Sequence, residues 1–410
     1  MLNVQPSHHV LFVNRVFPPD RGATGQYLHA LAAELLERGW RVSIVVAKTV
    51  SRTEPDTKGI VVRRMRGLPY RRKPMWYRAI AYLSLYPAML WGIWRVGRPD
   101  VIVVMTDPPL FFSAAVFYAK WRRIPVIHWC QDVYPELAFA LGLIKETGII
   151  GRTLVSLRTH ALDRCGSIVA IGGCMARVLR GRTSAAIEIV PNWSELAHTQ
   201  PSPQEANPFR ANLLPAPNGQ IVMYSGNIGL GHPFDAILAA MDELGTDRPT
   251  VRFAVIGDGP RLNDLKAEVE RRALKNVIFF PHQPNSNLGQ TLGAADIHLA
   301  CMEPDLLGLI APSKVYGILA AGRPCIFLGP AESEVAVAIS HSGAGEVLPP
   351  GRQHELGARL RVWLDDQAAR ESAGRNARSA AEQNSIARSA SAFDRILREA
   401  LLQPHPADAG

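Results

Sequence analysis

The chain has 410 residues, more than a single hydrophobic core usually serves, so its length predicts two domains. Hydrophobic residues make up 47% of it and charged residues 20%, which excludes a disordered chain and indicates a folded globular protein. Lysine and arginine number 45 against 36 aspartates and glutamates, and this excess of +9 favours a negatively charged partner.

The cysteines and the N-terminal residues indicate the cellular compartment in which the protein is expected. The five cysteines show no CxxC spacing, which indicates reduced thiols in a cytosol. Residues 1–20 lack a charged start followed by a long apolar run, so we expect no signal peptide and a cytoplasmic protein.

Strands alternate with amphipathic helices along the first half of the chain. Apolar residues recur at helical spacing from Leu28 to Leu36, and Gly39 ends that helix. We predict strands at 9–13, 42–47, 100–105, 124–129, 167–171 and 187–193. The pattern is typical of a parallel, doubly wound sheet with helices on both faces.

The alternation restarts after a linker at 201–217, which is rich in proline, asparagine and glutamine. Further strands are predicted within 220–229, 252–260, 275–284, 295–302 and 323–330. We therefore expect an α/β fold of two facing Rossmann-like domains, 1–198 and 199–387, with a cleft between them. Ligands of such sheets bind beyond the carboxyl ends of the strands.

The stretch "APSKVYGILAAGRPCIFLGP", residues 311–330, is the most informative part of the chain. It places Ser313 and Lys314 at a predicted helix start. Backbone N–H groups there carry partial positive charge and the lysine adds a full one, which suits a diphosphate. An ordinary helix capped by serine would read the same way.

A basic segment runs from Arg63 to Arg98, with nine basic residues, no acidic one and seven aromatic ones. Within it, 79–94 is uncharged but interrupted by Pro87, and it is shorter than the roughly 20 apolar residues of a membrane span. We expect a helix in the headgroup region of an anionic membrane. A buried helix with a basic flank is the alternative; no nucleic-acid module is recognisable, and we expect no nucleic-acid partner.

Six segments follow one another in a recognisable order. They are "FPPDRGATGQYLHALAAELLERGWRVSIV", "HWCQDVYPELAFALG", "IVPNW", "YSGNIGLGHPFDAILAAMDEL", "VIGDGPRLNDLKAEVERRALKNVIFFPHQP" and the Ser313–Lys314 stretch. Together they resemble the GT-B glycosyltransferases of family 4, especially bacterial enzymes similar to fucosamine transferases of polysaccharide synthesis. The resemblance extends over nearly the whole chain.

The resemblance implies transfer of a sugar from a nucleotide sugar with retention of configuration. We expect the nucleotide to be UDP and the transferred sugar to be an N-acetylated amino sugar or a deoxy sugar. The resemblance further implies donor binding mainly by the second domain, no metal and no cofactor. The acceptor would be a polyprenyl-linked glycan of surface polysaccharide synthesis, met at the inner face of the plasma membrane. A last helix, 388–410, would return to the first domain.

The resemblance also assigns residues to the donor. A departing nucleotide diphosphate develops negative charge that the protein must stabilise. The phosphate-binding candidates are Lys314, also considered catalytic, with Ser313, Arg323, Gly226, Asn227, Gly229, and Gly22 and Gly25 from the first domain. The candidates for base and ribose are Gly257, His282, Gln283 and Glu303, with Asp305 beside the last.

The chain departs from the family pattern at four positions. Asn227 and His232 stand where many members carry arginine and lysine, and Leu309 and Gly317 where many carry glutamates. We therefore expect Lys314 to carry more of the diphosphate, and the ribose contact stays unassigned.

In the first domain, Asp132 follows a predicted strand and could accept the proton of the attacking hydroxyl or orient the acceptor. A helix cap or a loop salt bridge is its structural alternative. His128, Tyr134 and Glu136 flank the same junction and are acceptor-side candidates, although His128 also fits a structural role.

Two other functions fit parts of the pattern. A sugar-nucleotide epimerase shares the two-domain architecture and would convert its donor without an acceptor. An inactive scaffold at the membrane surface would fit the missing glutamates, and would bind neither UDP nor GDP.

Overall fold

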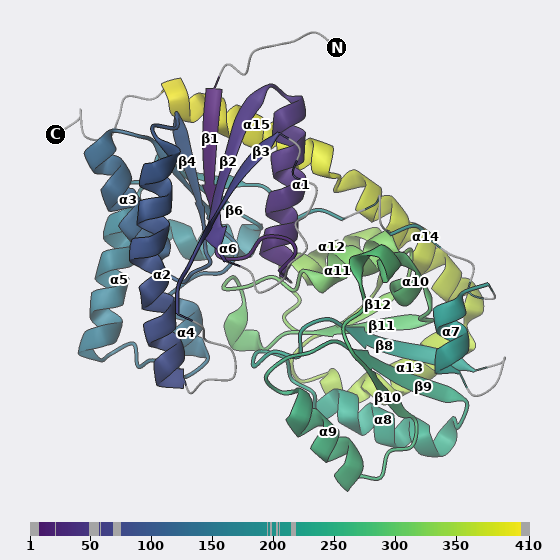
Figure 1. Cartoon of the computed structure of the whole chain (residues 1–410). Coiled ribbons are helices and arrows are strands. Elements are labelled where there is room, and N and C mark those ends of the chain that lie inside the picture. Colours follow the sequence, from purple (N-terminus) through teal and green to yellow (C-terminus); the bar gives the residue numbers. More distant parts are fainter. Residues whose placement is uncertain are drawn as a thin grey trace. The chain divides into compact units, whose positions relative to one another are not determined.

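The computed structural model describes residues 8–20, 22–48, 57, 59–68, 75–194, 196, 199–201, 204, 206–214 and 219–402. The chain forms two compact units. The first comprises residues 1–192, 308–310 and 386–410, and the second 193–307 and 311–385. Each is a parallel sheet covered by helices on both faces, so the predicted α/β class with two Rossmann-like domains is confirmed (Figure 1).

The first unit contains a seven-stranded parallel sheet in the order β3-β2-β1-β4-β5-β6-β7. Its strands are β1 (His8–Val13), β2 (Trp40–Ala47), β3 (Ile60–Met65), β4 (Val101–Met105), β5 (Val126–Cys130), β6 (Ser167–Ala170) and β7 (Ile187–Ile189). The order reverses direction between β1 and β4. Because loops diverge from each other there, this point of the carboxyl edge is the expected ligand site.

Helices cover both faces of this sheet. They are α1 (Ala23–Glu37), α2 (Met75–Val96), α3 (Phe111–Arg122), α4 (Glu136–Ala140), α5 (Ile149–Leu162), α6 (Gly173–Arg180) and α15 (Ile386–Leu402). Helices α2, α3 and α5 lie on one face, and α1 and α15 on the other (Figure 1). No helix of the described residues is long and apolar enough to cross a bilayer.

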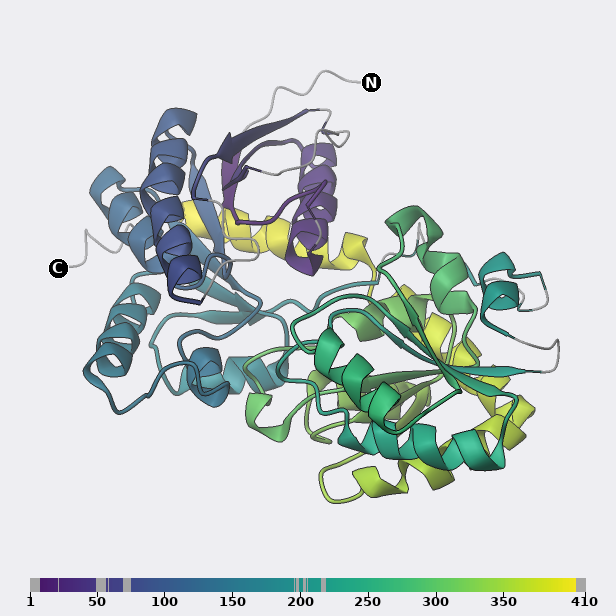
Figure 2. The same ribbon diagram turned by 60° about the horizontal axis from the view of Figure 1, so that its bottom comes forward.

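The last helix completes the core of the first unit. It runs beside α1 (Figures 1 and 2). The ring of Phe393 packs edge-on against Trp129 of β5, with 4.7 Å between centroids. The Trp40 indole donates to Asp394 at 2.6 Å, which fixes the helix against the start of β2.

The second unit contains a six-stranded parallel sheet in the order β10-β9-β8-β11-β12-β13. Its strands are β8 (Gln220–Ser225), β9 (Val251–Ile256), β10 (Val277–Phe280), β11 (Ile297–Cys301), β12 (Cys325–Leu328) and β13 (Gly345–Leu348). The order reverses between β8 and β11, which places their following loops side by side.

The helices of this unit are α7 (Pro208–Leu213), α8 (Asp235–Asp247), α9 (Leu262–Arg271), α10 (Leu288–Gly293), α11 (Lys314–Ala320), α12 (Glu334–Ser342), α13 (Leu356–Asp365) and α14 (Gln367–Gln383). Helix α7 lies inside the segment predicted as linker. Asn207 caps it by accepting from two main-chain N–H groups, and the helix buries Leu213.

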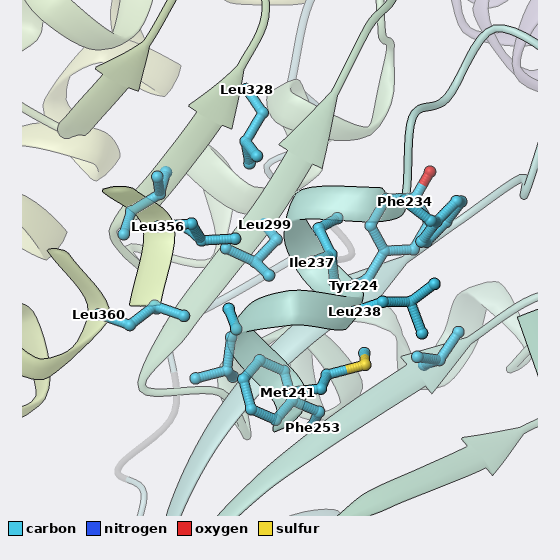
Figure 3. Close-up of a cluster of buried hydrophobic side chains, with 14 of the residues drawn as sticks. Tyr224, Phe234, Ile237, Leu238, Met241, Phe253, Leu299, Leu328, Leu356 and Leu360 are labelled. Atoms are coloured by element: carbon cyan, nitrogen blue, oxygen red, sulfur yellow. The ribbon is translucent and has the colours of Figure 1, made fainter. Parts of the chain in front are cut away.

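Alternate residues of β8 enter two different cores. Val222 and Tyr224 join the larger cluster under α8, where Phe234, Ile237 and Met241 pack against the sheet (Figure 3). Ile221 and Met223 enter a smaller cluster with α7 on the opposite face. Burial on both faces holds the carboxyl end of β8 in place, and the candidate donor site begins there.

Candidate active site

The centre of the second-unit site is the amine of Lys314, at the first turn of α11. It donates to the Tyr224 hydroxyl, and Nζ lies 3.7 Å from the centroid of the same ring and 3.4 Å from the carbonyl oxygen of Asn227. Burial lowers the pKa of Lys314 to about 8, against an opposing effect of the thiols of Cys301 and Cys325. Within the part of the chain that the structure describes, no carboxylate pairs with this amine, which leaves it available to an anion.

The loop after β8 approaches this amine closely. Gly226 has φ of +125°, and a Cβ built there would lie 3.4 Å from Cε of Lys314. Gly257 after β9 has φ of +141°, and a Cβ there would lie only 2.1 Å from the Gly226 oxygen. Both positions therefore require glycine, and the two loops pack backbone to backbone.

The main-chain donors of this loop are used differently from the prediction. The Gly226 N–H donates to the Ile256 oxygen at 2.8 Å, and the Gly229 N–H to Nδ1 of His232 at 3.1 Å. Neither N–H group is free to bind a phosphate, because each already donates a hydrogen bond to another group of the protein. The N–H of Asn227 has no partner among the described residues and stays a candidate.

Two other phosphate candidates differ in their placement. Ser313 is half-buried and directly precedes α11, but its hydroxyl makes no capping bond to the helix. Arg323 lies beyond the opposite end of α11, whose seven residues span about 10 Å. It precedes β12 at the amino edge of the sheet, so its predicted contact with the phosphates disagrees with the fold.

The base and ribose candidates all follow the carboxyl ends of strands. Gly257 follows β9, His282 and Gln283 follow β10, and Glu303 follows β11. The Gln283 amide donates to Pro281 in its own loop at 2.8 Å, and the Glu303 N–H donates to the Gly231 oxygen at 3.0 Å. These positions at the carboxyl edge of the sheet are compatible with contacts to the base and ribose, and the four assignments stay predictions.

Neither of the two positions at which many family members carry a glutamate holds a carboxylate in this chain. Leu309 is buried and Gly317 lies within α11, whereas Asp305 is exposed. None of the three provides a half-buried carboxylate at the carboxyl edge, and the ribose contact stays open.

The first unit brings together a second group of polar residues at its own reversal point. Arg15 follows β1 and Asp107 follows β4, and their side chains form an ion pair of 2.7 Å. The Arg15 guanidinium lies 5.4 Å from the centre of the Tyr82 ring of α2. Asp132 follows β5; burial, followed by repulsion from Asp107, raises its pKa to about 7. Such a carboxyl group can exchange a proton near neutral pH.

Two acceptor-side predictions need correction. His128 is fully enclosed, stacked on Phe112 with centroids 4.2 Å apart, and burial lowers its pKa to about 4. Glu136 is 7% exposed and forms an ion pair with Arg158 and another with Arg182 at 3.3 Å. Both side chains are committed inside the domain, so we assign them a structural role.

The remaining first-unit candidates lie close to the carboxyl edge. Tyr134 is half-buried beside Asp132, and burial, with the charge of Asp132, raises the pKa of its hydroxyl. Gly22 immediately precedes α1. Gly25 packs so tightly on the main chain of Val16 and Phe17 that a Cβ would lie 3.0 Å from it. The packing alone explains Gly25, and phosphate contact stays a prediction for both glycines.

The sequence prediction missed several residues of these two groups. Tyr224 accepts a hydrogen bond from Lys314 through its hydroxyl. Arg15 pairs with Asp107, whose charge acts on Asp132. Arg15 and Asp107 had a usable signal, because each is a charged residue two positions after the end of an apolar strand. Tyr224 had none, since it stands inside an apolar run and reads as core.

Two Rossmann-like units, each with a reversal of strand order at the carboxyl edge of its sheet, form the architecture of the GT-B class. Comparison with known proteins agrees: residues 22–193 match the family described as glycosyl transferase 4-like domain, and residues 206–380 match glycosyl transferases group 1. The chain therefore belongs to the GT-B glycosyltransferases.

Its relatives include bacterial enzymes. WbjE of Pseudomonas aeruginosa, named as a glycosyltransferase, is 24% identical over 83% of this chain and 86% of its own. WcaI of Escherichia coli strain K12, named for colanic acid biosynthesis, is 27% identical over 63% of each chain. Among solved structures, Anabaena Alr3699/HepE in complex with UDP-glucose has a TM-score of 0.73 at 15% identity, covering 96% of this chain and all of the other.

Proposed function

We propose that this protein is a retaining glycosyltransferase that moves a sugar from a UDP-linked donor to a polyprenyl-diphosphate-linked glycan in surface polysaccharide synthesis. The observation that carries the proposal is the Lys314 amine, a half-buried cation without a carboxylate partner among the described residues, beside the Gly226 position that accepts only glycine. The UDP-glucose complex of the structural neighbour supports UDP, and the name of WcaI supports polysaccharide synthesis. The donor sugar would be an N-acetylated amino or deoxy sugar.

In the proposed reaction the bond from the anomeric carbon to the diphosphate oxygen breaks, and an acceptor oxygen bonds to that carbon on the face that the diphosphate leaves, so the configuration is retained. The electron pair leaves with the nucleotide diphosphate. Lys314 stabilises the charge that develops there, and such a preorganised donor is typically worth a factor of about 10²–10³ in rate. The acceptor proton passes to Asp132, whose pKa of about 7 suits this transfer.

The test uses purified protein with a panel of UDP and GDP sugars, with and without a short lipid-linked acceptor, read by mass spectrometry. We expect one donor to be consumed only when the acceptor is present. Consumption without acceptor would favour the epimerase, and calorimetry that detects binding of neither UDP nor GDP would favour the scaffold.

We further propose that the first unit docks on the inner face of the plasma membrane through α2. Among the residues of α2 whose side chains the structure describes, the exposed ones before Arg95 are all apolar and recur at helical spacing: Ile80, Leu83, Pro87, Trp91 and Trp94. Leu83 is 62% exposed, and exposed Arg95 and Arg98 follow the stripe. An apolar face beside cations suits an anionic bilayer. The predicted basic cluster Arg71, Arg72 and Lys73 lies outside the described residues.

Cosedimentation with vesicles of phosphatidylglycerol and phosphatidylcholine tests this docking. The double replacement Leu83→Glu and Trp91→Glu should release the protein from the vesicles. Val362→Glu is the matched control, because Val362 is an equally exposed apolar residue of α13 in the second unit. Unchanged sedimentation of the α2 variant would reject the membrane proposal and leave the transferase proposal standing.

A further inference from the structure

The three helices on one face of the first sheet share a feature of composition. The sequences of α2, α3 and α5 contain basic residues but no aspartate or glutamate. The helices of the opposite face do carry carboxylates, Glu34 and Glu37 on α1 and Asp394 and Glu399 on α15. The two faces of one sheet therefore differ in charge, and the face of α2, α3 and α5 suits an anionic partner.

Helices α3 and α5 also expose apolar side chains on this face. Phe117 and Trp121 stand one turn apart on α3, and Trp121 is 75% exposed. Helix α5 begins with Ile149 and Ile150, of which Ile149 is 87% exposed. Leu157 is exposed as well, two turns after Ile150. Single exposed apolar residues are ordinary on a protein surface, whereas a group of them indicates an interaction site.

These residues continue the exposed apolar residues of α2. Helix α3 packs against both α2 and α5, and the three helices lie side by side (Figure 1). The exposed rings of Phe117 and His160 are 6.2 Å apart between centroids, which joins the surface of α3 to that of α5. Lys120 and Arg152 are exposed cations of the same two helices. The three helices thus present one surface that is both apolar and cationic.

The apolar residues lie at both ends of the helices. Helix α3 leads directly into β5, so Trp121 lies at the amino edge of the sheet. Helix α5 leads directly into β6, so its beginning, with Ile149 and Ile150, lies about 20 Å away toward the carboxyl edge. A partner that covers all three residues must be flat and follow the full length of the helices.

An anionic bilayer fits this surface better than a second copy of the chain does. Tryptophan and aliphatic side chains beside cations are typical of helices that lie in the interface of a membrane. A second copy would bring the cations of one face against those of the other, and the three helices contain no carboxylate to pair with them.

We propose that α3 and α5 lie flat on an anionic membrane together with α2, and that Trp121 and Ile149 enter the headgroup region at opposite edges of the sheet. The inference rests on the docking through α2 proposed above and adds an orientation to it. The strands of the first sheet run parallel to the bilayer in this orientation. The carboxyl edge, with Asp132, then opens along the membrane surface, where a lipid-linked acceptor diffuses.

Fluorescent labels at the two ends test this orientation. The five native cysteines are buried, so a nitrobenzoxadiazole label can be directed to Trp121→Cys or to Ile150→Cys. With vesicles of phosphatidylglycerol and phosphatidylcholine we expect the emission of both labels to rise, and lipids brominated on their acyl chains to quench both. Leu402→Cys is the matched control, because Leu402 is 85% exposed on α15 of the opposite face, and its label should stay in water.

A charge substitution measures how much α5 contributes. Ile149→Glu combined with Ile150→Glu should weaken vesicle binding at least about 10-fold in cosedimentation, because two apolar side chains leave the membrane. Leu402→Glu should leave vesicle binding unchanged. Both sites are exposed, so these variants should fold as the wild type does.

The outcomes separate this inference from the proposals on which it rests. If wild-type protein binds vesicles but the label at Trp121 or at Ile150 stays unquenched, the flat orientation is overturned and docking through α2 remains. If wild-type protein does not bind vesicles, the docking proposal and this inference both fail, while the transferase proposal stands. A dimer in analytical ultracentrifugation that the double glutamate variant dissociates would assign the face to a second copy and overturn the inference.

Discussion

Replacing Lys314 with methionine should raise stability while removing activity. In the folded protein the pKa of this amine is about 8 instead of 10.5, a difference that corresponds to about 3 kcal/mol against the charged form. The contact with the Tyr224 ring returns about 0.5–2 kcal/mol. Methionine, an apolar side chain of similar length, avoids the cost of burying a charge but loses the contact of the amine with the ring. The free energy of unfolding at pH 7 should therefore rise by about 1–2 kcal/mol.

The pH dependence of that gain identifies its cause. Because the folded-state pKa lies below the unfolded-state value, the penalty is complete below about pH 8 and disappears as the pH rises toward 10.5. Urea unfolding at pH 7 and pH 10 should therefore show the gap between variant and wild type closing. Turnover of the variant should fall by a factor of about 10²–10³.

Lys266→Met is the matched control. Lys266 also lies over an aromatic ring, 5.5 Å from the centre of Phe279, but it is exposed on α9. Its replacement should change neither turnover nor the pH dependence of unfolding. Near-normal turnover of Lys314→Met, or a variant less stable than wild type at pH 7, would refute the reasoning.

Three other replacements test further parts of the structure. In the wild type, kcat/KM should rise through about pH 7 as Asp132 loses its proton, and Asp132→Asn should abolish this limb together with most of the rate, which a pH–rate profile measures. Arg158→Met should lower the free energy of unfolding by about 3 kcal/mol, because it strips a buried carboxylate of its principal partner, and adding Glu136→Leu should recover most of the loss in a urea titration. Gly257→Ala should cost roughly 1–3 kcal/mol, seen in the melting temperature, and weaken UDP binding in calorimetry, because its Cβ would meet the Gly226 oxygen at 2.1 Å.

The sequence identified the interior of both sheets better than their edges. Strands β1, β4 and β8 each contain a run of at least four consecutive buried apolar residues, and these runs located them in the sequence. The two unpredicted strands, β3 and β13, each form one end of a sheet. An edge strand is half exposed and tolerates charge, as the arginines of β3 show, so its apolar signal is weak.

The candidate site shows the same limit at the level of single residues. Lys314 was identifiable because it stands beside a helix start and a glycine-ended turn. Its contact with Tyr224 depends on β8 and β11 lying next to each other, and strands so distant in sequence carry no sign of that order. The engaged N–H groups of Gly226 and Gly229 were equally hidden, because a glycine-rich loop looks the same whether its donors face inward or outward.

The return of α15 has a consequence for biosynthesis. Phe393 and Asp394 are synthesised some two hundred residues after the last strand of the sheet that they complete. Until they emerge from the ribosome, the nascent first unit exposes Trp129 and the apolar face beside α1. The second unit has all its strands by residue 348 and can fold earlier. The amino-terminal half is thus the last to mature, and an interruption of translation late in the message would leave it vulnerable to proteases and chaperone capture.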